Sequence, residues 1–570
     1  MGKSAFGSID LWVALCVIYF ADNVLVVSHT PCTGTALHVG AWIVLYMLLR
    51  CAPLARIPHK VWAYLCAALG CIQAGLGLMQ LMGFQPSGHH LYAMTGTFFN
   101  PAPFGAFLAV MLVVVLATYK REGGKALGVA AVVLLIVLPA AWSRAALLSC
   151  AACMALLYRA YMVRYWKAVV ACSVVTLVVL YFLKRGSADS RALMFIVSFR
   201  IWMKHFWLGT GVGGYLHALG EGQSEYFATH PDSVFIPSVG VADLPFCEPI
   251  RLAVEMGAVG LVLVTGVLAL TAWRLWRSGH PLFYALLALQ VFSLFSYPFN
   301  IPVFGVILAV IVATAANTGE GRLVSAGKVC SLLGAMALGF TVFTLLMPRK
   351  EAEKEHELFS YLKDEAFIKD YYELLPKLND NPKFLFNFGS LLRDAGRYND
   401  SNAMLRQGTL LSADPMFHIL MGRNYEDMQE YGTADSLYCH AFHMVPNRVY
   451  PLYRRMKLYE TMRDSTRMLD MARRVTDFKV KVESPATRDM KKEAEEMITT
   501  TNYRIFLENA EIRIRRFRND TYDIDNKKVS LWAMPLIKEN VFNNKNNVGR
   551  RNKFIWYFLS CKKCNYLNNY

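Results

Sequence analysis

Long apolar runs are the feature that most constrains how this chain can fold. Up to residue 348, eleven segments stay apolar over a length that crosses a lipid bilayer or falls slightly short of it. They lie near residues 9–28, 37–51, 61–84, 103–119, 126–142, 144–158, 168–183, 249–273, 281–297, 302–317 and 326–347. We therefore expect residues 1–348 to form an all-α polytopic membrane domain of about eleven transmembrane helices. Bilayer thinning or a re-entrant hairpin would accommodate the shorter runs.

The composition agrees with a membrane protein. Of the 570 residues, 55% are hydrophobic and 18% are charged, which is less charge than a typical globular domain carries. A formal net charge of +17 in a soluble protein would suggest nucleic acid as a partner. Most of the relevant basic residues, however, lie in short loops between apolar runs, so we interpret them as topology signals and expect no nucleic-acid partner. The 13 cysteines are scattered and predict no disulfide framework.

The distribution of basic residues predicts the orientation of the membrane domain. Alternate short loops are basic, whereas loops 29–36, 85–102 and 298–301 contain no Lys or Arg. Basic loops resist translocation, so we expect the amino terminus on the cytoplasmic side of the membrane. The loop 184–248 and the chain after residue 348 would then lie on the opposite, outer side. That loop is itself basic; long loops translocate regardless of charge, but the alternative is that its basic residues face an anion.

A repeat begins where the composition turns polar. The stretch from Phe384 is echoed from His418, with Tyr398 and Tyr431 at equivalent places thirty-three residues apart, and more weakly up to Leu469. This period and its Gly, Ala and Tyr punctuation resemble tetratricopeptide (TPR) repeats, whose stacked helix pairs usually bind peptides or proteins. We therefore predict a TPR-like helical domain over residues 349–510 with a possible protein partner; stacking alone is the alternative.

Residues 511–570 are predicted to form a poorly ordered tail. The chain is helical and basic in pattern to about residue 520 and becomes rich in Asn and Lys beyond residue 535. A lone Cys561-x-x-Cys564 pair and an Asp523-x-Asp525 pair occur there, but neither has the surrounding motif that a metal site or a nucleotide-sugar site needs. We assign no metal site to the chain.

Three outward-facing stretches carry the chemistry. They are TGTFFNPAPFGAFLA at residues 95–109, WSRAALL at residues 142–148, and the loop 184–248 with the start of the helix after it. In the last, Ser190 and Arg191 are followed by Gly209 and Gly211, and EMGAVG occupies residues 255–260. In this order, over residues 90–265, the motifs resemble the O-antigen ligase and O-antigen polymerase superfamily.

The resemblance implies a glycosyltransferase that uses a lipid carrier. Such enzymes move a preassembled glycan from undecaprenyl diphosphate to an acceptor hydroxyl at the periplasmic face of the bacterial inner membrane, without a cofactor, a nucleotide sugar or a metal. The resemblance therefore implies that the loop 184–248 and the chain after residue 348 are periplasmic. The acceptor would be the lipid A core, a growing polysaccharide or an exported protein. Arg144 and Arg191 occupy the family's arginine positions, where guanidinium groups would stabilise the negative charge on the departing diphosphate.

The acceptor hydroxyl must also lose a proton, which requires a base. The family position for a histidine holds Phe246 in this chain. Glu248 is the nearest titratable substitute, and His230 is the second candidate, followed by His217. Lone histidines in loops are more often structural or solvated.

The remaining candidates are polar or small residues near these motifs. We expect the following residues to contribute to substrate binding: Asn100, Arg200, Lys204, Gly209, Gly211 and Glu255. For Arg200 and Lys204 the alternative is a solvated loop charge, and for the glycines it is a turn. A snorkelling role is the alternative for Arg144.

Other functions remain open at this stage. Within the same class, the chain would be a polymerase that joins repeat units. A carrier-lipid flippase or transporter would need charged residues within the membrane and internal repeats among the helices. A membrane-anchored scaffold that uses only the repeats would leave the arginines unexplained.

Overall fold

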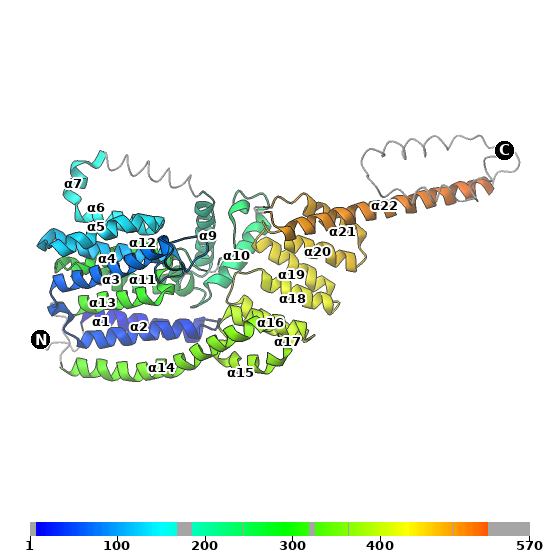
Figure 1. Cartoon of the computed structure of the whole chain (residues 1–570). Coiled ribbons are helices and arrows are strands. Elements are labelled where there is room, and N and C mark those ends of the chain that lie inside the picture. Colours follow the sequence, from blue (N-terminus) through cyan, green and yellow to red (C-terminus); the bar gives the residue numbers. More distant parts are fainter. Residues whose placement is uncertain are drawn as a thin grey trace. The chain divides into compact units, whose positions relative to one another are not determined.

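In the computed structural model, helices connected by loops make up the described part of the chain (Figure 1). It describes residues 7–167, 185–242, 244–318, 325–362, 364–480 and 483–522. No β-strand occurs within these ranges, so the all-α prediction is confirmed for them. The predicted apolar run at 168–183, the residues from 523 onward and both motifs of the predicted tail lie outside the described residues.

Ten apolar helices coincide with ten of the eleven predicted runs. They are α1 (Ser8–Asp22), α2 (Thr33–Cys51), α3 (His59–Leu81), α4 (Pro101–Glu122), α5 (Lys125–Ala140), α6 (Arg144–Leu157), α11 (Glu248–Arg277), α12 (Leu282–Ser293), α13 (Pro302–Ala316) and α14 (Ser325–Leu362). Within the described part of the chain, six are long and apolar enough to cross a membrane: α1 with the π-helical turn Asn23–Val27 that extends it, α2, α3, α4, α11 and α14. The other four have 10–17 residues. A short helix, α7 (Arg159–Arg164), follows α6.

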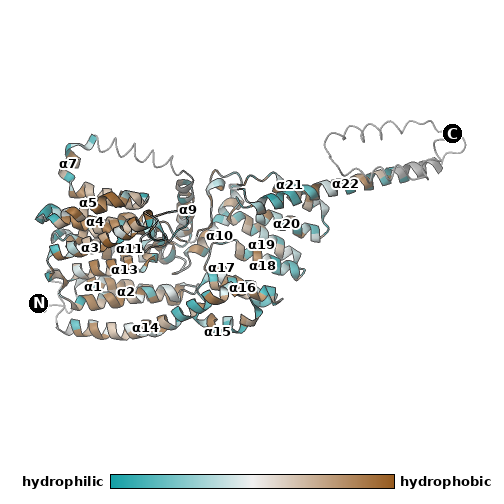
Figure 2. Cartoon of the chain, in the orientation of Figure 1, coloured by the Kyte–Doolittle hydropathy of each residue, from teal (hydrophilic) through white to brown (hydrophobic). Residues whose placement is uncertain are grey.

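Helix α4 lies at the centre of this bundle. Helices α3, α5, α6 and α12 pack against it, and every residue from Pro103 to Thr118 is buried. The outer helices are different, because α14, which packs along α2, exposes Leu333 and Phe340 by 59% and 72%. Figure 2 shows hydrophobic residues along helices of this bundle such as α2, α3 and α5. An apolar exterior of this extent is costly in water and suits lipid, which supports a membrane protein.

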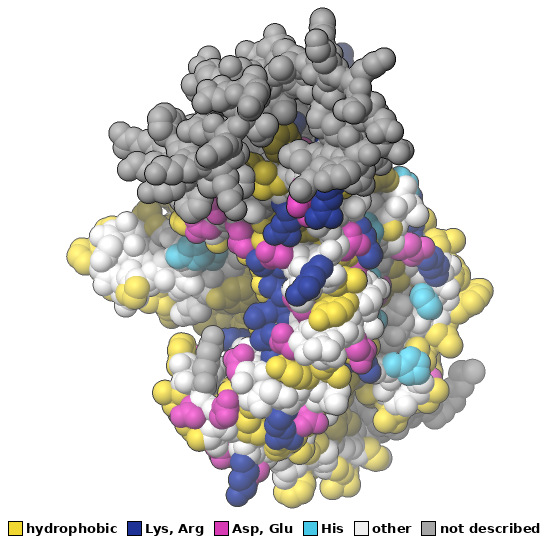
Figure 3. Space-filling view, turned by 90° about the vertical axis from the view of Figure 1, so that its right-hand side faces the viewer, with side chains coloured by type: hydrophobic (Ala, Val, Ile, Leu, Met, Phe, Trp, Pro, Cys, Tyr) yellow, Lys and Arg dark blue, Asp and Glu magenta, His cyan; other side chains and the backbone are white. Residues whose placement is uncertain are grey.

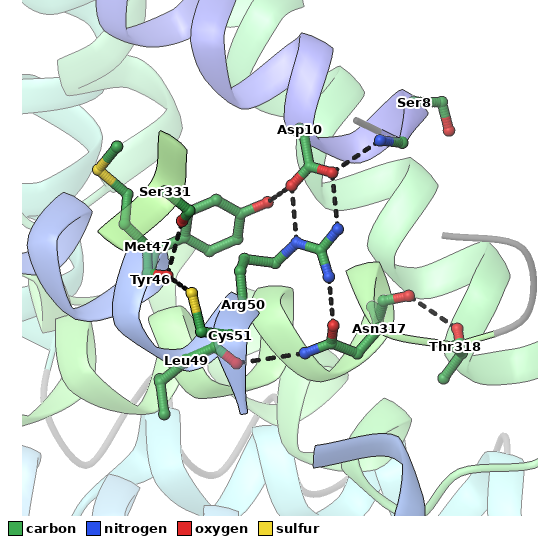
Figure 4. A network of polar contacts seen from close by, with 12 residues as sticks. Ser8, Asp10, Tyr46, Met47, Leu49, Arg50, Cys51, Asn317, Thr318 and Ser331 are labelled. Atoms are coloured by element: carbon green, nitrogen blue, oxygen red, sulfur yellow. Dashed lines mark hydrogen bonds and ion pairs between the residues drawn. The ribbon is translucent and has the colours of Figure 1, made fainter. Parts of the chain in front are cut away.

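A buried ion pair joins the ends of α1, α2 and α13 (Figure 4). Arg50, at the end of α2, donates from Nε to Asp10 Oδ1 and from Nη2 to Asp10 Oδ2, each at 2.7 Å. Tyr46 donates its hydroxyl to the same carboxylate at 2.6 Å, and Arg50 also donates to the side chain of Asn317. Removing one partner of a satisfied buried pair costs about 3–5 kcal/mol, so this network is a strong constraint on how the three helices meet.

The polar stretch 184–248, predicted as a loop, contains two helices where it is described. They are α9 (Arg185–Lys204) and α10 (Tyr215–Thr229), followed by a 3-10 turn at Ile236–Ser238. Leu193, Val197 and Ile201 recur every four residues and are buried in one cluster with Leu219 and Phe227 of α10. The stretch is therefore amphipathic, and its apolar residues pair the two helices.

The chain after residue 367 forms helix pairs of constant period. The helices are α15 (Ile368–Leu378), α16 (Pro382–Asp394), α17 (Tyr398–Thr409), α18 (Met416–Asp427), α19 (Tyr431–Met444), α20 (Tyr450–Thr461), α21 (Ser465–Thr476) and α22 (Pro485–Tyr522). The second helix of each pair starts at Tyr398, Tyr431 and Ser465, at intervals of thirty-three and thirty-four residues. The turns before them share a backbone of positive φ, at Gly396, Gln429 and Arg463.

Charged side chains link neighbouring helices of this region. Arg454 of α20 pairs with Glu426 of α18 at 2.7 Å, and Arg455 pairs with Asp435 of α19 at 2.7 Å. Figure 3 views the molecule from the right-hand side of Figure 1. It shows lysine and arginine side chains gathered in the middle of that face, with acidic side chains next to them. Many basic side chains of the repeats therefore have acidic partners within the repeats.

Residues 1–498 form one compact unit, and residues 499–570 form a second. The predicted membrane and repeat domains thus belong to the same unit, and α14 runs through the predicted boundary at residue 348. Two contacts explain why. Met444 and Val445 are buried in the cluster that joins α9 to α10, and Asn447 Nδ2 donates to the carbonyl of Val239 at 2.7 Å.

Candidate functional site

A pocket of about 270 Å³ lies where the first residues of α4 and α6 meet α9. Arg144, Arg191 and Asn100, which come from three different predicted motifs, all line it, together with Phe246 and Tyr297. We call it the arginine pocket. The structure therefore brings together three residues that the sequence analysis selected separately.

Local sequence explains how two of these residues reach the pocket. Asn100 is the N-cap of α4, where its Oδ1 accepts a hydrogen bond from Ala102 N at 3.0 Å, and Pro101 has the backbone geometry of a first helical residue. Ser143 caps α6 in the same way through Ala146 N at 3.3 Å, which makes Arg144 the first residue of that helix. Both helices begin at the pocket.

The pocket is electropositive for two reasons. It holds two guanidinium groups, and the N-terminal ends of α4 and α6 add the positive ends of two helix dipoles. Burial and the nearby Arg144 charge lower the pKa of Arg191 from the usual arginine value, while Tyr297 acts in the opposite direction. No carboxylate of the described residues forms an ion pair with Arg191. An anion bound beside Arg191 would offset the effect of burial on its charge.

Phe246, at the position where the resemblance implies a histidine base, contacts the arginine instead. The guanidinium of Arg191 lies over the Phe246 ring, with its carbon 5.1 Å from the ring centroid. The Tyr297 ring meets the Phe246 ring edge-on at 5.6 Å between centroids. This cation–π contact holds Arg191 in the pocket but supplies no proton acceptor.

An apolar cavity of about 820 Å³ lies on the other side of the loop that ends at Asn100. Thr97, Phe98 and Phe99 of that loop line this cavity, whereas Asn100 lines the arginine pocket. The rest of its wall comes from α3, α4, α12 and α13 and is almost entirely aliphatic or aromatic. An electropositive pocket and an apolar cavity therefore share one loop.

Glu248 and Glu255, two of the predicted site residues, lie outside the arginine pocket. Glu248 is buried, accepts a hydrogen bond from Phe299 N at 3.1 Å and pairs with Arg251 Nε at 2.8 Å. Glu255, one turn beyond Arg251 on α11, is also buried. Oε1 of Glu248 therefore has an N–H donor, and Oε2 lies beside the Arg251 guanidinium without a hydrogen bond to it. The buried ion pair favours a structural role over that of a base.

Gly209 and Gly211 pack against the backbone of α11 and do not line the pocket. Gly211 N donates to the carbonyl of Glu255 at 3.0 Å, and Thr210 N donates to the carbonyl of Val254 at 2.8 Å. A Cβ at Gly209 would lie 2.4 Å from the carbonyl of Glu255, at a φ of +78°. These glycines allow two backbones to approach closely, which is the turn interpretation of the motif.

Arg200, Lys204 and His230 also lie away from the arginine pocket. Arg200 lies over the Tyr226 ring, and Lys204 forms an exposed ion pair with Glu225 at 2.6 Å. His230 follows the end of α10, where its ring stacks on Tyr226 and its Nδ1 is 2.9 Å from the Tyr226 carbonyl. The structure gives these three side chains local partners on α10.

Sequence reasoning missed Tyr297 as a site residue and did not assign a role to Arg251. Arg251 follows Glu248 by three residues and precedes Glu255 by four, which is the spacing of ion pairs on one helix face. That signal was available in the sequence. Tyr297 comes from the α12–α13 connection, and no local pattern points to it.

Comparison with known proteins identifies no relative: no protein-family model matches the chain, and no curated protein shows significant similarity to it.

Proposed function

We propose that the chain is a membrane glycosyltransferase that moves a preassembled oligosaccharide from undecaprenyl diphosphate to an acceptor hydroxyl. The observation that carries this proposal is the arginine pocket, where Arg144 and Arg191 meet at the N-terminal ends of two helices. In this reaction the bond from the sugar's anomeric carbon to the diphosphate oxygen breaks, a bond to the acceptor oxygen forms, and the acceptor hydroxyl releases its proton to the departing diphosphate or to water. Charge develops on the departing diphosphate, and both arginines would bind it.

The apolar cavity beside the pocket supports a substrate of this kind. A polyprenyl diphosphate has an anionic head and a hydrocarbon chain. The loop ending at Asn100 separates an electropositive pocket from an apolar cavity of about 820 Å³, so head and chain would bind on its two sides. A soluble nucleotide sugar has no hydrocarbon chain that could fill the apolar cavity.

The wider architecture in this proposal is that of an eleven-helix domain in the bacterial inner membrane. The four shorter apolar helices and the run at 168–183 would complete the set of six long ones. In the orientation that the basic loops favour, the arginine pocket would lie at the periplasmic face. Helices α16–α21 would be a TPR-like domain that presents an exported protein or a protein partner to the pocket, which the period of thirty-three to thirty-four residues supports.

The test uses a strain that lacks the gene and is complemented with wild type, Arg191→Ala, Arg191→Lys or the control Arg277→Ala, an exposed arginine at the far end of α11. The same extracts are blotted for the protein, for lipopolysaccharide ladders and for glycosylated exported proteins. We expect Arg191→Ala to lower transfer by about 10²–10³-fold, as removal of one charge-stabilising donor does. Arg191→Lys would recover little of this loss, because an ammonium group cannot bind two oxygens in a fork.

The pattern of loss identifies the acceptor. Loss of the whole ladder with its single-unit forms would mean ligation to the lipid A core, and surviving single-unit forms would mean polymerisation. Loss of protein glycans alone would mean an oligosaccharyltransferase for exported proteins. Normal ladders and normal protein glycans at equal protein level would remove the diphosphate role from Arg191.

A further inference from the structure

A second cavity, of about 1040 Å³, lies between α10 and the helical repeats. It is lined by α9, α10 and α19 and shares no lining residue with the arginine pocket. Three side chains meet beside it: Glu221 of α10, His418 of α18 and His440 of α19. Their nearest ligand atoms all lie within 4.8 Å of one another.

The contacts inside this cluster leave metal-binding atoms facing each other. His440 Nε2 is 3.1 Å from Glu221 Oε1, and the rings of His418 and His440 are 4.6 Å apart between centroids. His418 Nδ1 is buried and has no hydrogen-bond partner. A buried ring nitrogen without a partner is costly, and a bound cation would satisfy it.

The surrounding contacts are those of ligating histidines, which usually bond through the second ring nitrogen to an oxygen. His440 Nδ1 is 3.1 Å from Ser224 Oγ, so a protonated Nδ1 would leave the lone pair on Nε2, beside Glu221. His217, one turn before Glu221 on α10, has Nδ1 2.9 Å from the carbonyl of Thr409. With the proton on that nitrogen, Nε2 of His217 also carries a lone pair.

We propose that Glu221, His418 and His440 bind one divalent transition-metal ion of the zinc class, with water as the fourth ligand. Two imidazoles and one carboxylate favour such an ion over Mg²⁺ or Ca²⁺, which prefer oxygen ligands. Zinc–ligand distances of about 2.0–2.2 Å keep ligand atoms about 3.4 Å apart, so small side-chain rotations would close the cluster.

The ion would fasten the α9–α10 segment to the repeats. Glu221 belongs to the stretch between two membrane helices, whereas both histidines belong to the repeat region. The proposed transfer reaction needs no metal, so this ion would be structural and would not act on the glycan.

The experiment measures bound metal in the full-length protein, purified in detergent through a tag without histidine. Protein loaded with Zn²⁺ and dialysed is compared with Glu221→Gln, His418→Gln and His440→Gln. His443→Gln is the matched control, because His443 lines the same cavity but is not part of the cluster. We expect about one zinc ion per chain in wild type and in the control, and at least a tenfold loss in each of the three variants.

Glu221→Gln separates this proposal from a simple ion pair. Glutamine still offers an oxygen to a protonated His440 Nε2, so the hydrogen bond between the two side chains would be preserved although the charge is lost, but glutamine is a much weaker zinc ligand. Cobalt added to wild type should produce visible absorption bands of a tetrahedral site that are absent in this variant. The proposal would be overturned if wild-type protein retained no zinc and gave no such cobalt spectrum. It would also be overturned if His443→Gln lost as much bound zinc as the three ligand variants. The readout is bound metal, so it does not depend on the transferase assignment.

Discussion

At the scale of single residues, Phe246 has the most direct consequence for the proposed chemistry. Its ring lies under the Arg191 guanidinium, a contact worth about 1 kcal/mol, or roughly a fivefold change in an equilibrium. We expect Phe246→Leu to lower kcat/KM for glycan transfer by about fivefold and Phe246→Tyr to keep it, because only leucine removes the ring. Transfer assays with purified lipid-linked donor in detergent would measure this. Equal losses in both variants would mean that the ring does not act through Arg191.

Two roles for Glu248 can be distinguished by experiment: a base in the transfer reaction, or a structural partner of Arg251. Its carboxylate pairs with Arg251 at 2.8 Å and is buried, and breaking such a pair costs about 3–5 kcal/mol. We expect Glu248→Gln to lower the Tm of the detergent-solubilised protein, and Arg251→Gln to lower it similarly, as scanning fluorimetry would show. If Glu248→Gln instead had the wild-type Tm but no longer turned over the glycan donor, the Glu248 carboxylate would again be the candidate base.

Individual side chains also show the limits of motif reasoning. Arg144 and Arg191 were selected from sequence because each stands in its own short motif, and both line one pocket. Glu248, His230, Arg200 and Lys204 were selected mainly because they are polar and close in sequence to these motifs. Their partners, Arg251, Tyr226 and Glu225, satisfy them locally. Proximity along the chain did not predict which charges already had a partner.

At the scale of elements, helix α11 is interrupted at Gly257. The backbone there has φ +63° and ψ −167°, a region that only glycine adopts easily. The break frees amide groups that the 206–211 segment satisfies, since Ala258 N donates to the carbonyl of Phe206 at 2.7 Å. The glycines of the predicted motifs therefore serve to join α11 to the chain before α10.

We expect Gly257→Ala to reduce folded protein severely. Backbone strain alone costs about 1–3 kcal/mol, and a Cβ would lie 2.1 Å from the carbonyl oxygen of Trp207. Gly240→Ala is the matched control, because nothing lies within 4 Å of its Cβ position. Size-exclusion chromatography and Tm measurements would compare the two. A monodisperse Gly257→Ala protein with the wild-type Tm would show that α11 is not held at this break.

At the scale of the whole molecule, the repeats cover part of the segment between the membrane helices. Met444 and Val445 complete the apolar cluster of α9 and α10. We expect a chain ending at residue 362 to expose that cluster and to be cleaved by protease within residues 205–247. A chain ending at residue 498 keeps the first compact unit and should resist cleavage as wild type does. Equal resistance in both truncations would mean that the repeats are a separable arm.

The sequence by itself determined the helical class, the position of the apolar helices and the phase of the repeat. These are local properties, because hydropathy over some twenty residues and a period of thirty-three or thirty-four residues are both read along the chain. Only the tertiary structure decided that residues 184–248 form helices, that α10 packs on the repeats, and that Glu248 is paired with Arg251 while Arg191 faces Arg144. Each of these depends on contacts between segments far apart in sequence, where burial and the charge of a neighbour determine what a side chain can do.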